Sequence, residues 1–222
     1  MDISADQVRT AIVSLIAFIL SVAVHEFGHA WMANRLGDRL SAAQGRLTLS
    51  PLAHIDLIGT ILLPLFAAFA PGRAPLLAWG KPVQTNPSAY RGVSPRVGNL
   101  LVSLMGPFMN LVLAVAISIV LIALSHVVKL PPDLVVGAIR YFLVLNLSLM
   151  FFNLLPLPPL DGGSLLLLVL PDSLQPITRV LQRYGMLILY GLLLTGAMSV
   201  LMYPAELVAG VWARTVLRLM NG

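Results

Sequence analysis

The sequence has no cysteine and very little charge. Without cysteine, the 222-residue chain forms no disulfide and offers no thiolate to a metal, so a metal site must use His, Asp or Glu. Charged residues make up only 10% of the chain and hydrophobic residues 58%, whereas a soluble globular domain carries about 25% charged residues. This composition excludes the ordinary soluble class and predicts an integral membrane protein whose solvent is the lipid bilayer.

The positive charges show no nucleic-acid footprint. The 14 Lys and Arg residues give a formal net charge of +5, but they are scattered between apolar segments, as expected of residues that flank membrane helices. We therefore expect no nucleic-acid partner. The N-terminus carries Asp2 and Asp6 ahead of a long apolar run, and we interpret that run as a retained helix rather than a cleaved signal peptide.

The apolar stretches predict an all-α polytopic membrane protein with about four to six membrane segments. A spanning helix needs about 20 apolar residues. Four stretches meet that length: residues 11–33, 97–124, 135–156 and 184–203. The segment 55–70 is shorter and contains Pro64, so a re-entrant segment is favoured over a full span. Residues 205–220 read as an interfacial amphipathic helix or a short span.

The stretch 71–96 is rich in proline and glycine and predicts a loop, in which a short strand or hairpin fits near Trp79–Gln84. With the N-terminus outside and 55–70 re-entrant, nine basic residues lie on the cytoplasmic side, and Arg9, Lys129 and Arg140 lie outside. This bias agrees with the positive-inside rule. A full span at 55–70 would instead move the loop's basic residues outside and spoil the bias.

Residues 25–29 read His-Glu-Phe-Gly-His within the first predicted helix. His25 and His29 are one turn apart and share a helix face, so both imidazoles can bind one Zn²⁺. Glu26 is placed to take a proton from a water activated by the metal. The same five residues occur by chance in soluble proteins, but a charged group in a membrane helix costs about 2.5–3.5 kcal/mol. Metal coordination offsets that cost and favours a metal site over buried histidines that are merely hydrogen-bonded.

A catalytic zinc site has three protein ligands and an open position. The only other glutamate, Glu206, lies at the far end of the chain, so a second-glutamate pattern fails. Asp161 stands in Asn153-Leu-Leu-Pro-Leu-Pro-Pro-Leu-Asp-Gly-Gly163, where prolines and glycines break a membrane helix. The topology places Asp161 on the same side as His29, which makes it the favoured third ligand over an exposed turn residue.

These motifs resemble the site-2 protease family of intramembrane zinc metalloproteases. His-Glu-Phe-Gly-His and the Leu-Asp-Gly segment carry the resemblance, and Gly106-Pro-Phe-Met-Asn110 looks like a further family motif. The stretch 45–65 is similar to compact bacterial members, and no insertion is long enough for a PDZ domain. The resemblance covers roughly residues 15–170, within a single protease domain over 1–222 whose catalytic core is about 11–170, followed by C-terminal helices at 184–220.

The resemblance implies His25, His29 and Asp161 as ligands of one Zn²⁺ per chain and Glu26 as general base. It also implies that Asn153 positions substrate or polarises the scissile carbonyl, although a plain helix-end residue is the alternative. For Asn110, an interhelical hydrogen bond and a substrate contact are both open.

His54 and Asp56 also invite a second-metal interpretation. They stand two residues apart at a probable segment start. Capping or a supporting hydrogen bond is favoured over a second metal.

The expected function is hydrolysis of peptide bonds in single-span membrane proteins, in a bacterial plasma membrane, with the active site toward the cytoplasm. One rival is a membrane metal transporter or sensor, which needs His and acidic residues but not Glu26. A second rival is a relative that binds substrate without cleaving it. No feature of the sequence indicates an oligomeric state.

Overall fold

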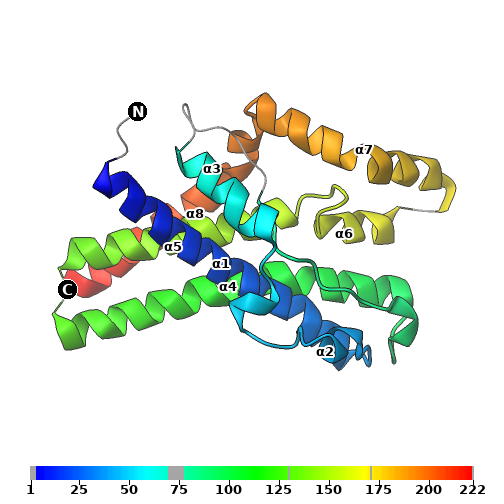
Figure 1. The fold of residues 1–222 in the computed structure, drawn as a ribbon, viewed down its shortest axis with the longest axis horizontal. Helices are drawn as coiled ribbons and strands as arrows, with labels where there is room; N and C mark the ends of the chain where they lie inside the picture. The colour runs from blue at the N-terminus through cyan, green and yellow to red at the C-terminus, as the bar shows by residue number, and fades with distance from the viewer. Residues whose placement is uncertain (1–3, 70–77, 130, 171, 222) are drawn as a thin grey trace.

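We describe the protein from a computed structural model that covers residues 4–69, 78–129, 131–170 and 172–221. These residues form helices joined by turns and extended connections, and they contain no strand (Figure 1). The α-helices are α1 (Ala5–Arg35), α2 (Leu40–Ala43), α3 (Leu63–Phe69), α4 (Pro95–Val128), α5 (Pro132–Asn153), α6 (Gly162–Val169), α7 (Gln175–Leu194) and α8 (Ala197–Asn221). The short helical turns are η1 (Pro51–Ala53), η2 (Leu57–Leu62, a π-helix), η3 (Pro87–Ala89) and η4 (Asp172–Leu174).

Local sequence signals set where the long helices begin. Ser4 and Gln7 form a capping box at the start of α1, with the Ser4 Oγ accepting from the Gln7 N–H at 3.2 Å. Ser94 caps α4, and Pro95 occupies its first turn, where no intrahelical donor is required. These caps satisfy N–H groups that a helix end would otherwise leave unpaired.

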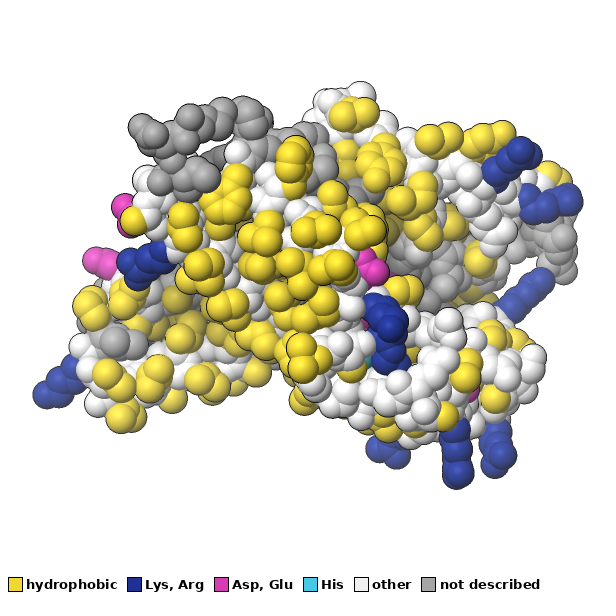
Figure 2. Space-filling view, in the orientation of Figure 1, with side chains coloured by type: hydrophobic (Ala, Val, Ile, Leu, Met, Phe, Trp, Pro, Cys, Tyr) yellow, Lys and Arg dark blue, Asp and Glu magenta, His cyan; other side chains and the backbone are white. Residues whose placement is uncertain are grey.

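Four described helices are long and apolar enough to cross a membrane, namely α1, α4, α5 and α8. Large apolar side chains on them are exposed, including Ile12, Ile119 and Val127, and hydrophobic side chains cover much of the face in Figure 2. Such extensive apolar surface is stable against lipid rather than water. The protein is therefore an integral membrane protein.

The four helices pack in sequence, with α4 against α1, α5 against α4, and α8 against α5. In Figure 1, α1 begins and α8 ends toward the same end of the bundle, so the helices cross in alternating directions. In the buried core between α4, α5 and α8, large apolar side chains of α5 pack against mostly small side chains of α4 and α8. The members of this core are Ala114, Val135, Ile139, Leu143, Leu147, Ala205, Ala209 and Val216. The alanines of α8 let its backbone approach α5 closely.

The fourth expected span, residues 184–203, has the wrong boundaries. The structure divides it between α7 and α8 at Gly196, whose φ of +73° lies in the left-handed region. Glycine adopts that conformation without steric cost and commonly ends a helix. The spanning candidate is α8, which absorbs the 205–220 segment that was expected to be separate.

The segment expected to be re-entrant forms a short apolar helix over Leu57–Phe69. At about 1.5 Å per residue, this helix reaches about 20 Å, short of a hydrocarbon core of about 30 Å. The described helix is therefore too short to cross the hydrocarbon core, and that the segment enters and leaves on one side stays a prediction.

The close contact between α1 and α4 depends on Gly28. A Cβ added there would lie 2.7 Å from the Met105 carbonyl oxygen and 2.8 Å from the Met109 Cγ. We expect Gly28→Ala to destabilise the protein by about 1–3 kcal/mol, as overpacking does, and to lower the melting temperature of the detergent-purified protein.

The matched control is Gly137→Ala on α5, where an added Cβ meets nothing within 4 Å. This substitution should leave the melting temperature unchanged or raise it, because alanine favours the helix. Equal melting temperatures for the two variants would contradict the packing account.

Candidate metal centre

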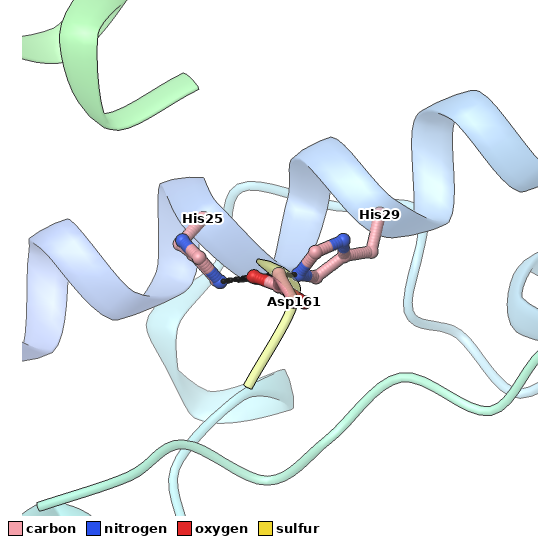
Figure 3. A group of neighbouring side chains, drawn as sticks. All are labelled: His25, His29 and Asp161. Atoms are coloured by element: carbon pink, nitrogen blue, oxygen red, sulfur yellow. Dashed lines mark hydrogen bonds and ion pairs between the residues drawn. The ribbon is translucent and has the colours of Figure 1, made fainter. Parts of the chain in front are cut away.

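His25 and His29 point to the same side of α1, one turn apart (Figure 3). Both side chains are buried. Their Nε2 atoms lie 3.0 Å apart, and the rings meet edge to face with centroids 4.7 Å apart. The helical spacing thus presents both imidazoles to one point, as the sequence predicts.

Asp161 reaches this point from the loop between α5 and α6 (Figure 3). Its Oδ2 lies 3.2 Å from the His25 Nε2 and 3.5 Å from the His29 Nε2. The loop is tightly folded, since a Cβ on Gly162 would lie 2.3 Å from the Leu154 carbonyl oxygen. Although Asp161 stands at the N-cap of α6, its carboxylate makes no capping hydrogen bond. The carboxylate is therefore free to face the imidazoles.

Helix α4 sets the orientation of both rings. The Nδ1 of His25 lies 2.7 Å from the Asn110 Oδ1, and the Nδ1 of His29 lies 2.8 Å from the Val102 carbonyl oxygen. A carbonyl oxygen only accepts, so each Nδ1 must carry the proton and donate it. The tautomer assigned in this way leaves a lone pair on each Nε2.

These residues fit a divalent metal. Two Nε2 lone pairs and the Asp161 Oδ2 face one another, and that oxygen is buried with no hydrogen-bond donor among the described residues. Three such atoms repel one another unless a cation lies between them. Their separations of 3.0, 3.2 and 3.5 Å are close to the roughly 3.4 Å between ligand atoms about 2.1 Å from a tetrahedral zinc.

Glu26 faces the same cavity as the three ligand candidates. The cavity has a volume of about 500 Å³ and is lined by α1, α4, α5, the Asp161 loop, α7 and the segment after residue 77. Glu26 is buried, and its Oε2 accepts a hydrogen bond from the Val83 N–H at 3.0 Å. The carboxylate thus opens to the cavity without being one of the three converging ligands.

The segment Trp79–Gln84 runs along this cavity in an extended conformation but does not form the strand that the sequence predicts. Its alternate N–H groups bind a π-helix, a turn and a carboxylate instead of a neighbouring strand. They donate from Trp79 to the Gly59 O at 3.2 Å, from Lys81 to the His54 O at 2.8 Å, and from Val83 to the Glu26 Oε2 at 3.0 Å. Without a partner strand, no ladder forms.

The other edge of this segment makes no backbone hydrogen bond to any other described residue at Gly80, Pro82 or Gln84. Gly80 and Pro82 line the cavity. Gly80 is required there, because an added Cβ would lie 2.3 Å from the Val22 Cγ1. Two residues of this unpaired edge therefore lie in the wall of the cavity that holds the metal centre.

The remaining predicted residues fall in different places. Asn153 lines the cavity, and its Nδ2 donates to the Leu149 O at 2.9 Å. Its role toward substrate stays a prediction. Asn110 is fully buried between helices and binds His25. Its interhelical hydrogen bond is thus the alternative that the geometry supports.

His54 and Asp56 do not join a metal cluster. Asp56 caps η2 by accepting from the Ile58 N–H at 3.1 Å and the Gly59 N–H at 2.7 Å. The His54 Nε2 lies 2.9 Å from the Thr48 carbonyl oxygen. Among the described residues, the group of three ligand types is His25, His29 and Asp161.

The sequence analysis assigned no role at the site to two residues that support it, Gly106 and Arg46. A Cβ on Gly106 would lie 2.4 Å from the His29 Nε2 and 2.7 Å from the His25 Nε2, so Gly106 leaves open the space that a metal requires. Arg46 is buried and donates to the Ala53 carbonyl and, at 3.5 Å, to the Lys81 carbonyl. The glycine within the Gly-Pro-Phe-Met-Asn motif was a usable signal for the first. For Arg46 no signal exists without the fold.

Two imidazoles and a carboxylate that converge beside a buried glutamate, among membrane helices, define a membrane metalloprotease site. The chain belongs to Peptidase family M50, the site-2 protease family, and the sequence model of that family matches residues 13–132 and 133–196. No PDZ domain is found. The protein is therefore a zinc metalloprotease.

Curated relatives carry names of the same class. The chain is 35% identical over 195 residues to YwhC of Bacillus subtilis (strain 168), whose name describes a zinc metalloprotease, covering 86% of this chain and 84% of that protein. It is 32% identical over 204 residues to Rip2 of Mycolicibacterium smegmatis, also named as a zinc metalloprotease, covering 89% and 74%. Stage IV sporulation protein FB of Bacillus subtilis is 30% identical over 159 residues, covering 70% and 50%. No solved structure matches the chain.

Gly106 lies so close to His25 and His29 that we expect even one added methyl group to block the metal site. We expect Gly106→Ala to weaken zinc binding by at least about tenfold, comparable to the loss of a supporting contact, because the methyl would displace both Nε2 atoms. Metal analysis of the purified protein and competition with a chromophoric chelator measure this effect.

Gly191→Ala on α7 is the control, since an added Cβ there meets nothing within 4 Å, and its zinc content should equal that of the wild type. Full zinc occupancy in Gly106→Ala would show that the ion does not lie between the two rings.

Proposed function

We propose that the protein hydrolyses peptide bonds of membrane-embedded or membrane-adjacent protein substrates, as a single membrane-embedded protease domain. The observation that carries this proposal is that Glu26 and the three converging atoms of His25, His29 and Asp161 open to one cavity among membrane helices. A water and a peptide carbonyl can meet there away from the lipid.

His25, His29 and Asp161 would hold the zinc ion. When bound, zinc supplies a Lewis acid for the scissile carbonyl and for the attacking water. Glu26 accepts the proton of that water as the oxygen attacks, and returns it to the departing amine. The Val83 N–H holds the Glu26 Oε2 at 3.0 Å, which keeps the carboxylate turned toward the cavity.

Asn153 lines the cavity at the end of α5. Its Nδ2 is bound to the Leu149 carbonyl, which fixes the amide and leaves its oxygen for a substrate N–H. We assign it a role in orienting the substrate backbone.

The free edge at Gly80, Pro82 and Gln84 suits a substrate in extended conformation. A transmembrane helix must unwind before its backbone is accessible, and its freed N–H and C=O groups then need partners. Strand addition to this edge supplies them beside the metal. The substrate class we propose is therefore a single-span membrane protein whose helix unwinds locally.

The centre would face the cytoplasm of a bacterial plasma membrane. Arg9 lies near the start of α1, and Arg214 and Arg218 lie near the end of α8, whereas eight described basic residues lie between the end of α1 and the start of α4 or in the first half of α7. They are Arg35, Arg39, Arg46, Lys81, Arg91, Arg96, Arg179 and Arg183. In Figure 2, the Lys and Arg side chains lie mainly on the right-hand part of the face. The positive-inside rule places that side in the cytoplasm.

Glu26→Gln separates proton transfer from metal binding. Glutamine keeps an oxygen for the Val83 N–H but cannot take a proton, so we expect cleavage to fall by about 10²–10⁴-fold while zinc content stays at the wild-type level. Cleavage of a panel of single-span proteins in proteoliposomes, with metal analysis on the same samples, measures both.

His25→Ala is the comparison variant and should lose zinc and cleavage together. If Glu26→Gln cleaved at the wild-type rate, or if the wild type moved zinc across the membrane without cleaving any substrate, protease chemistry at this centre would be refuted.

The strand-addition proposal predicts a specific effect at Gln84. Gln84→Pro removes the N–H at the free edge, so we expect kcat/KM to fall roughly tenfold, the worth of one or two hydrogen bonds, with zinc content unchanged. Gln84→Ala removes the same side chain, including its 2.8 Å contact with Gln44, but keeps the N–H. It should cleave like the wild type, and equal cleavage by the two variants would remove strand addition at this edge.

A further inference from the structure

Asn146 is a fully buried amide on α5 that no part of the proposed chemistry uses. Its Oδ1 accepts a hydrogen bond from the Asn110 Nδ2 at 3.1 Å, and its own Nδ2 donates to the Phe142 carbonyl at 3.0 Å. An amide in a membrane helix is costly unless its groups are paired. A hydrogen bond connects Asn146 to Asn110, which in turn binds His25 at the metal centre.

The hydrogen bonds determine which way both amides point. The Phe142 carbonyl can only accept, so the Asn146 NH₂ must face it and the Asn146 oxygen must face Asn110. That oxygen, like the Ser21 carbonyl 3.2 Å from the Asn110 Nδ2, can only accept. The Asn110 NH₂ therefore binds both, and the Asn110 oxygen is left facing His25.

The orientation of the two amides determines which ring nitrogen of His25 carries the proton. The Asn110 Oδ1 lies 2.7 Å from the His25 Nδ1, so that nitrogen donates and the Nε2 keeps its lone pair toward Asp161 and His29. A flipped Asn110 would turn its NH₂ toward His25, favour the other tautomer, and put a proton where a metal must bind. The Phe142 carbonyl on α5 acts through Asn146, and the Ser21 carbonyl on α1 acts directly. Together they hold the Asn110 amide, which in turn orients the His25 ring.

We propose that Asn146 is a positioning residue, which holds the Asn110 amide in the orientation that keeps the His25 Nε2 available to zinc. The inference rests on the proposed metal site, but it concerns zinc affinity and is measured without any cleavage assay. Since the Ser21 carbonyl still restrains Asn110 when Asn146 is replaced, the expected loss in affinity is about tenfold, the low end for such supporting contacts.

The experiment measures the zinc dissociation constant of purified protein by chelator competition, for Asn146→Leu and Asn146→Ala. Leucine fills the volume and alanine leaves a cavity, yet both remove the acceptor for Asn110. We expect the same roughly tenfold loss in affinity from both. A packing role would give a larger loss for alanine than for leucine, and this outcome would overturn the proposal.

A double-mutant cycle tests whether Asn146 acts through Asn110. In an Asn110→Leu background, Asn146→Leu should cause no further loss of zinc affinity. Independent, additive losses would overturn the proposal. Ser118→Ala is the control, because Ser118 is buried on α4, as Asn110 is, and its hydroxyl donates to the Ala114 carbonyl of its own helix. The zinc affinity of this variant should equal that of the wild type.

The melting temperatures of the metal-free variants keep the result interpretable. Equal melting temperatures with weaker zinc binding support the positioning role, whereas zinc loss that follows a fall in melting temperature overturns it. Failure of the wild type itself to bind zinc would instead count against the proposed function, so the two failures are distinguishable.

Discussion

Three electron-pair donors held together inside an apolar bundle are the constraint on which this structure depends. The Nε2 atoms of His25 and His29 and the Oδ2 of Asp161 lie 3.0–3.5 Å apart. Because each Nδ1 donates to α4, each neutral imidazole keeps the lone pair of its Nε2 toward the other two atoms. Such an arrangement is repulsive by itself and becomes favourable only around a cation. The surrounding helices must therefore hold the ligands against their mutual repulsion.

Helix α4 supplies most of that support from three consecutive turns. The Val102 carbonyl orients His29, Gly106 leaves the space in front of both rings, and Asn110 orients His25. The spacing of four residues puts these groups on one face of α4, toward α1. Gly28 permits the two backbones to approach. A rigid helix thus sets ring geometry more reproducibly than a loop would, as a metal site requires.

Sequence reasoning found the ligand candidates because their chemistry is local and costly in a membrane. His25 and His29 share one turn, and Asp161 sits in a helix break that a bilayer tolerates only inside protein. The fourth span was misplaced because apolar residues continue across Gly196 and hide the helix end there. Asn146 and Arg46 could not be found, since the contacts that link them to the site, with Asn110 and with the Lys81 carbonyl, span 36 and 35 residues. Such contacts depend on how helices rotate against each other, which hydrophobic periodicity leaves open.

The extended segment beside the centre shows how one stretch of backbone can serve two purposes. In an extended chain, alternate residues present their N–H and C=O groups to opposite sides. One side of Trp79–Gln84 is committed to the protein, through Gly59, His54 and Glu26, and this edge holds Glu26, the general base that we propose, against the segment. Because those bonds use only Trp79, Lys81 and Val83, the N–H groups of Gly80 and Gln84 and the carbonyls of Gly80, Pro82 and Gln84 are left for the second chain that we propose. A substrate backbone that paired with that second edge would be aligned by the same segment that holds Glu26. The segment would therefore set both the position of the substrate and the position of the proposed base.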